Sequence, residues 1–173
     1  MHIEEPRQQL DHMLRQSRMN MVSFSQMADT KANILLSISS VLLTITLTRI
    51  SDPKFTLSLV VLTSFLLVTI FLALMTVFPK LHSLLPKKHS TKDPDYNPFF
   101  FANYANIPYD EYSGDLEKTM NNSDRTYEIM IKEIYYSGIY LEKSKYVYIR
   151  FGYMSFFAGL FFSTIIFFIK NLI

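Results

Sequence analysis

Three long runs without a charged residue constrain the fold of this chain more than any other feature. They extend from Ala32 to Thr48, from Phe55 to Pro79 and from Phe151 to Ile169, and count 17, 25 and 19 residues. An α-helix of roughly 17 to 25 residues crosses a hydrocarbon core of about 30 Å, because each residue adds about 1.5 Å. The pattern therefore predicts three transmembrane helices, at about residues 32–49, 55–78 and 151–169.

Composition agrees with a membrane protein. Of the 173 residues 49% are hydrophobic, and the apolar residues are concentrated in the three runs. The charged segment before the first run makes a removable signal peptide unexpected, since such peptides are short and end at a small-residue cleavage site. The chain has no cysteine, which fits a cytosolic part that needs no disulfides.

Lysine and arginine are distributed unevenly along the chain. Fourteen of the 17 lie before the first run or between the second and the third, and the other three are Arg49, Lys54 and Lys170. Segments rich in these residues stay on the cytoplasmic side of the membrane. We therefore expect the N-terminus, residues 1–31 and residues 80–150 to be cytoplasmic.

The segments expected in the cytoplasm have helical periodicity. Apolar residues recur at helical spacing from Pro6 to Thr30, which predicts an arm that continues into the first span. A short helix is expected from Asp110 to about Met120, and Ser123 is the expected N-cap of one long helix that enters the third span. The fold class is an all-α membrane protein: three transmembrane helices with a small cytoplasmic helical domain, formed by the N-terminal arm and residues 80–150.

The first span carries a polar seam, spaced by three or four residues so that its members share one helix face: Asn33, Ser37, Ser40, Thr44 and Thr48. Its hydroxyls can bond carbonyls of their own helix or help helices pack, and such bonds contribute only about 0.6 kcal/mol on average. Alternatively, the seam is a surface that water can wet. In the third span Gly152, Ser155 and Gly159 form a small-residue face, which predicts a close helix contact.

Three segments together carry a resemblance to a known family: "ADTKANILLSISSVLL", "PFFFANYANIPYDEY" and "KSKYVYIRFGYMSFFAGLFF". The chain resembles the Pycsar transmembrane effectors over about residues 10–169, nearly its whole length. The resemblance implies a bacterial antiphage effector of the inner membrane. A neighbouring cyclase would make cyclic CMP or cyclic UMP upon infection, and the effector would respond by impairing the membrane. The chain has no HD-type phosphohydrolase domain, so that activity is not implied.

Charged residues at the cytoplasmic end of the first and third spans have two interpretations. In the structural one, Asp29 pairs with Lys145 or Arg150, and Lys31 extends to the lipid headgroups. In the functional one, the charges and the aromatic and amide residues after the second span bind a cyclic nucleotide: cations for its phosphate, aromatic rings and amides for its base. The candidate ligand residues are Asp29, Lys31, Phe101, Asn103, Tyr104, Tyr112, Lys143, Lys145 and Arg150.

Two functions of different classes follow. The first is a ligand-gated effector that senses a cyclic pyrimidine mononucleotide and oligomerises to impair the membrane. The second is a constitutive scaffold protein whose cytoplasmic helices bind a protein partner. No paired nucleophile and base, acid pair or metal-ligand spacing points to an enzyme, a metal or a cofactor. The expected partners are the lipid bilayer, the cyclic nucleotide and further copies of the chain, with no nucleic acid polymer.

Overall fold

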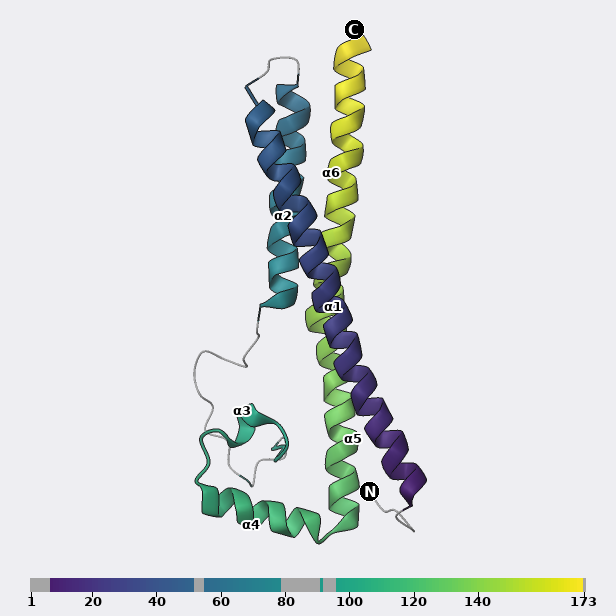
Figure 1. Ribbon diagram of the computed structural model, residues 1–173, viewed down its shortest axis with the longest axis vertical. Helices are drawn as coiled ribbons and strands as arrows, with labels where there is room; N and C mark the ends of the chain where they lie inside the picture. Colours follow the sequence, from purple (N-terminus) through teal and green to yellow (C-terminus); the bar gives the residue numbers. More distant parts are fainter. Residues whose placement is uncertain (1–6, 52–54, 79–90, 92–95, 173) are drawn as a thin grey trace. The chain divides into compact units, whose positions relative to one another are not determined.

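The computed structural model describes residues 7–51, 55–78, 91 and 96–172, and Figure 1 shows a chain built from helices. Residues 52–54 and most of the segment 79–95, which include several of the predicted cytoplasmic lysines, lie outside the described residues. The elements in chain order are α1 Gln8–Arg49, α2 Thr56–Val77, α3 Phe101–Tyr104, α4 Tyr109–Met120, α5 Ser123–Tyr140, the π-helix η1 Leu141–Tyr146, and α6 Val147–Leu172.

Both predicted long helices are present. The arm and the first span form one helix, α1, of 42 residues. The elements α5, η1 and α6 follow one another without a gap from Ser123 to Leu172. The six-residue π-helix between α5 and α6 was not predicted, because nothing in the spacing of apolar residues distinguishes it from an α-helix.

The chain divides into two compact units. Unit 1 comprises Met1–Met21 and Pro79–Gly138, and unit 2 comprises Val22–Phe78 and Ile139–Ile173. Unit 1 combines part of the N-terminal arm with part of the segment after the second span, over shorter ranges than the predicted 1–31 and 80–150. Because α1 and α5 each cross a boundary, each contributes residues to both units.

Unit 2 holds the apolar helices. Within the described residues three helical stretches are long and apolar enough to cross a membrane: α1, α2 and the run Ser123–Lys170. In unit 2 (Figure 1) α2 runs antiparallel to α1 and α6, and a core of Ala32, Leu35, Ala73 and Ile149 joins all three helices. Many large apolar side chains face outward, as expected where lipid replaces water. The chain is a multi-pass membrane protein.

The small residues of α6 make the close contact that their spacing predicts. A Cβ atom built on Gly159 would lie 2.5 Å from Cβ of Phe65 on α2, so only glycine fits there. One turn earlier the Ser155 hydroxyl donates to the Phe65 carbonyl at 3.1 Å. Small residues let two backbones approach, and the hydroxyl then reaches a carbonyl of the neighbouring helix. The expected small-residue contact is therefore confirmed.

Unit 1 is held together by polar contacts. The first N–H groups of α5 are capped by Asn122, whose side-chain oxygen accepts from the Arg125 amide at 3.0 Å. The expected cap Ser123 is therefore wrong by one residue, because the helix begins at Ser123 itself. The Tyr127 hydroxyl donates to Asp11 at 2.6 Å, and Arg18 pairs with Glu133 at 3.0 Å. Both contacts join α5 to the first turns of α1.

Replacing Gly159 by alanine tests the contact between α2 and α6. The added methyl group has no room beside Phe65, and overpacking of this kind costs about 1 to 3 kcal/mol. We expect Gly159→Ala to lower the thermal unfolding midpoint of the detergent-solubilised protein. Gly152→Ala should lower it less, because the first atom met, at 3.1 Å, is the end of the Leu35 side chain.

Gly138→Ala in α5 is the matched control for this prediction. No atom lies within 4 Å of its added Cβ, and alanine favours a helix over glycine by about 1 kcal/mol. This variant should melt at or above the wild-type temperature. Equal midpoints for Gly159→Ala and the wild type would contradict the close contact.

Candidate functional site

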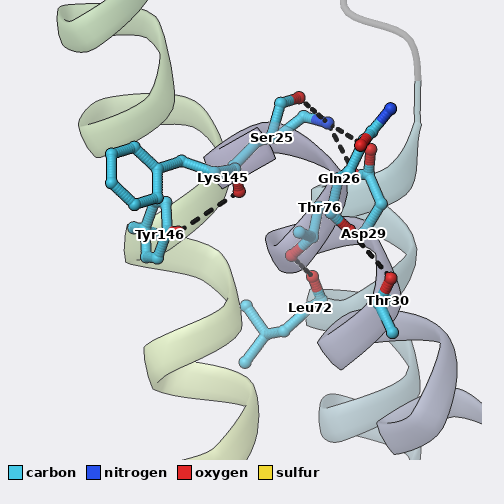
Figure 2. Close-up of polar contacts among 9 residues, drawn as sticks. Ser25, Gln26, Asp29, Thr30, Leu72, Thr76, Lys145 and Tyr146 are labelled. Carbon is cyan, nitrogen blue, oxygen red and sulfur yellow. Dashed lines mark hydrogen bonds and ion pairs between the residues drawn. The ribbon is translucent and has the colours of Figure 1, made fainter. Parts of the chain in front are cut away.

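The ammonium group of Lys145, in the last turn of η1, makes several hydrogen bonds within unit 2. Figure 2 shows it pointing at α1, where it donates to Ser25 Oγ at 2.9 Å and to both carboxylate oxygens of Asp29 at 2.6 Å. The next residue, Tyr146, donates its hydroxyl to the Phe24 carbonyl at 3.2 Å. Two consecutive residues of η1 thus hold one turn of α1.

Burial is unequal within this ion pair. The Lys145 side chain is 11% exposed and the Asp29 side chain 35%. An ammonium has three N–H donors, and the three acceptors here satisfy all of them. The charge of a buried lysine is tolerated only when it is paired in this way. Of the two partners expected for Asp29, the structure selects Lys145.

The other predicted cations of unit 2 remain open to an incoming anion. Lys31, Lys143 and Arg150 are exposed, and none of their side chains has an acidic partner in the part of the chain that the structure describes. The Arg150 guanidinium carbon lies 5.8 Å from the centre of the Phe151 ring. The Lys31 carbonyl accepts from the Tyr153 hydroxyl at 3.4 Å, which leaves the ammonium group unaffected. These three side chains therefore offer a positive charge to an anion, whereas the charge of Lys145 is already paired with Asp29.

The predicted aromatic and amide residues belong to unit 1. The rings of Tyr104 and Tyr112 are 5.0 Å apart at 41°, so each already packs on the other. Asn103 is 9% exposed. Phe101 begins α3, but its side chain lies outside the described residues. The prediction that these residues and the cations hold one nucleotide stays a prediction.

Unit 1 also contains a buried polar cluster that sequence reasoning missed. Arg125 at the start of α5 pairs with Asp115 of α4 at 2.5 Å. Burial, and then the nearby Asp115 charge, raise the pKa of Tyr96 to about 12, so its hydroxyl keeps its proton at neutral pH. Three buried oxygens find no partner among the described residues: Tyr96 Oη, Asp115 Oδ2 and Thr119 Oγ1. The turn between α4 and α5 brings positions 115 and 125 together, and no spacing rule links either of them to position 96.

The polar seam lies on the exposed face of α1. All five of its residues are exposed, whereas Ser39 and Thr46 on the other side of the helix are buried. Hydroxyls of the seam donate to carbonyls three or four residues earlier: Ser37 to Asn33 at 2.9 Å, Thr44 to Ser40 at 3.0 Å and Thr48 to Ile45 at 2.8 Å. Each hydroxyl oxygen can still accept a hydrogen bond. The seam is therefore compatible with lipid and also able to bind water.

Among the described residues no group of three His, Asp or Glu side chains could hold a metal ion. Unit 2 instead offers positively charged side chains to which an anion can bind. A phosphate group could bind Lys31, Lys143 or Arg150, or could compete with Asp29 for Lys145.

The chain is similar to a known protein family over most of its length. Residues 12–170 match the family described as the Pycsar effector protein domain. The match covers both units and all nine candidate ligand residues. No curated protein and no solved structure matches the chain.

Proposed function

The chain belongs to the Pycsar effector protein domain family, and from this premise we propose that it is an antiphage effector of the bacterial inner membrane. It senses a cyclic pyrimidine mononucleotide, cyclic CMP or cyclic UMP, on its cytoplasmic side. It then oligomerises and impairs the integrity of the membrane. The single observation that carries the proposal is the family match over residues 12–170, which leaves almost none of the chain for another function.

The proposed orientation rests on the distribution of charge. Fourteen of 17 lysines and arginines belong to residues 1–31 and 80–150, so these parts lie in the cytoplasm together with the N-terminus. The predicted spans of about residues 32–49, 55–78 and 151–169 then place Lys31, Lys143 and Arg150 at the cytoplasmic membrane surface. A nucleotide made in the cytoplasm reaches them without crossing the bilayer.

The proposed trigger is binding of the nucleotide phosphate by these exposed cations. A cyclic phosphodiester carries one negative charge and two free oxygens, which match ammonium or guanidinium donors. Lys31, Lys143 and Arg150 have no acidic partner among the described residues, so the first contact of the nucleotide with them costs no ion pair seen there.

The proposed damage depends on the polar seam and on several copies of the chain. One copy has three candidate spans, too few to surround a water-filled path, and its seam faces away from its own core. Copies that turn their seams toward a common centre would line that centre with hydroxyls. In the resting protein the hydroxyl protons of Ser37, Thr44 and Thr48 are satisfied within α1, so most of the seam tolerates lipid until the copies associate.

Reporter fusions test the orientation. Alkaline phosphatase folds only outside the cytoplasm, so a fusion after Ile173 should be active and an insertion after Lys92 inactive. A fluorescent protein that matures in the cytoplasm should give the opposite pattern at the same two positions. Alkaline phosphatase activity at Lys92 would exclude cytoplasmic sensing by this part of the chain.

Calorimetry on the full-length protein in detergent tests the trigger. We expect cyclic CMP or cyclic UMP to bind the wild type, and Lys31→Ala to weaken binding about 10- to 100-fold. Loss of one charge-assisted hydrogen bond costs about 1.5 to 3 kcal/mol, and every 1.4 kcal/mol is about tenfold. Arg49→Ala, at the other end of the same span, is the control and should bind normally. Absence of binding to the wild type would remove the nucleotide from the proposal.

Membrane depolarisation in cells tests the seam. With the cyclase switched on, cells with the wild-type protein should depolarise, and cells with the double variant Ser40→Val, Thr44→Leu should largely retain their potential. The control is Ser64→Val, Thr164→Leu, which removes two exposed hydroxyls that likewise bond their own helices, on α2 and α6. Equal depolarisation in the seam variant and the control, at matched membrane levels, would assign the seam to packing alone.

A further inference from the structure

A π-helix in the middle of a long helix is uncommon and has to be held in place. The π-helix η1, Leu141–Tyr146, interrupts an otherwise α-helical run in unit 2. Well under 1% of residues in soluble proteins are π-helical, and such turns occur often at functional sites. The contacts of η1 should therefore show what stabilises it.

The π-helix changes which side chains share a face. Leu141, Lys145 and Ile149 are all buried and follow one another in steps of four. In an α-helix each residue turns about 100°, so each step of four overshoots one full turn by about 40°, and two steps overshoot two turns by about 80°. The wider π turn takes up this excess, since its hydrogen bonds run from i to i+5. The π-helix thus keeps Leu141, Lys145 and Ile149 closer to one line along the buried face than an α-helix would.

The ion pair and the π-helix depend on each other. Converting the π turn to an α turn would rotate the residues before it relative to the residues after it, which would disturb the fit of Lys145 against Ser25 and Asp29. If the ion pair were lost, a lysine with an 11% exposed side chain would keep its charge without an acidic partner, which is unfavourable. The structure shows the π-helical arrangement with the pair formed; the alternative to it has the pair broken and Lys145 turned out.

We propose that η1 together with Ser25, Asp29 and Lys145 forms a latch, shown here closed, and that a phosphate-bearing ligand opens it by replacing Asp29 at Lys145. The choice of ligand rests on the proposed function; the latch itself rests on the geometry. The exchange conserves charge, because a carboxylate and a phosphodiester each carry one negative charge. Asp29 is the partner that can leave, since its side chain is already 35% exposed.

The latch is connected directly to the polar seam. Asp29 lies one turn before Asn33 on α1, so it extends the spacing of the seam by one member. The same turn of α1 is held a second time by the Tyr146 hydroxyl on the Phe24 carbonyl. Opening the latch rearranges η1, which carries both Lys145 and Tyr146, so both contacts with this turn of α1 are released and α1 can rotate its seam toward other copies.

Breaking the latch should activate the protein without any nucleotide. We expect Asp29→Asn and Lys145→Met to depolarise cells that lack the cyclase, at least fivefold more than the wild type at equal membrane level. The double exchange Asp29→Lys, Lys145→Asp should bring depolarisation back close to the wild-type level, because it forms the ion pair again with the charges reversed. Glu133→Gln is the control: it breaks the Arg18–Glu133 pair of unit 1 and should stay silent.

The outcomes separate the latch from the nucleotide trigger. Activity of Asp29→Asn without the cyclase, combined with silence of the wild type when the cyclase is on, would support the latch and overturn sensing of the nucleotide. Silence of both single variants without the cyclase would overturn the latch. Equal activity of Glu133→Gln would overturn it too, because loss of any ion pair would then suffice.

The distance between two spin labels in the purified protein tests the latch without any measurement of membrane damage in cells. The chain has no cysteine, so Thr30→Cys on α1 and Glu142→Cys in η1, both exposed, can be labelled uniquely. We expect the distance distribution between the labels in purified protein to shift on adding Asp29→Asn, and in the same direction on adding cyclic CMP or cyclic UMP to the otherwise unchanged protein. An unchanged distribution with Asp29→Asn would overturn the latch even if the variant were inactive in cells.

Discussion

A polar group that enters the hydrocarbon of a membrane must find its partner inside the protein, and unit 2 is organised around this constraint. The hydroxyls of Thr69 and Thr76, both almost completely buried, donate to carbonyls four residues earlier in α2. Ser155 reaches across to a carbonyl of α2, which the absence of a side chain at Gly159 makes possible. The hydroxyls of Ser39 and Thr63 are exceptions, since both are buried without a hydrogen-bond partner among the described residues. The three helices pack through small residues and leave their large apolar side chains to the lipid.

The same constraint explains the geometry at Lys145. A buried ammonium needs three acceptors, and no α-helical neighbour supplies them within its own helix. Ser25 and Asp29 supply them from α1, 120 and 116 residues away in sequence. The π-helix carries Lys145 on the buried face, between the buried residues Leu141 and Ile149. An unusual backbone and a buried charge, each unfavourable alone, are thus stabilised together.

Such an arrangement suits an effector that must stay harmless until a signal arrives. The seam of α1 faces outward with three of its four hydroxyl protons, those of Ser37, Thr44 and Thr48, bonded within the helix, which makes the single copy compatible with lipid. The charged contact lies one turn from the seam on the same helix. In our proposal a monoanionic ligand therefore competes at the contact that restrains the helix bearing the wettable surface. The cost of the switch stays small, because one anion replaces another.

Much of this protein could be predicted from its sequence, because hydropathy, charge and helical periodicity are local properties. The three spans, the 42-residue α1, the helix from Ser123 onward and the tight face of Gly152 and Gly159 depend only on residues a few positions apart. The family was recognisable from three short segments. Asp29 stood out because an acid at the edge of an uncharged run needs a partner.

Other features were decided by the tertiary structure. The pairing of Asp29 with Lys145 rather than Arg150, the burial of Ser39 instead of Ser40, and the cluster of Tyr96, Asp115 and Arg125 depend on how each helix is rotated about its axis. That rotation is set by close contacts between distant segments and, at η1, by one π turn that shifts every later residue relative to the earlier ones. A sequence pattern places residues on a helix face, but only packing against other helices determines where that face points.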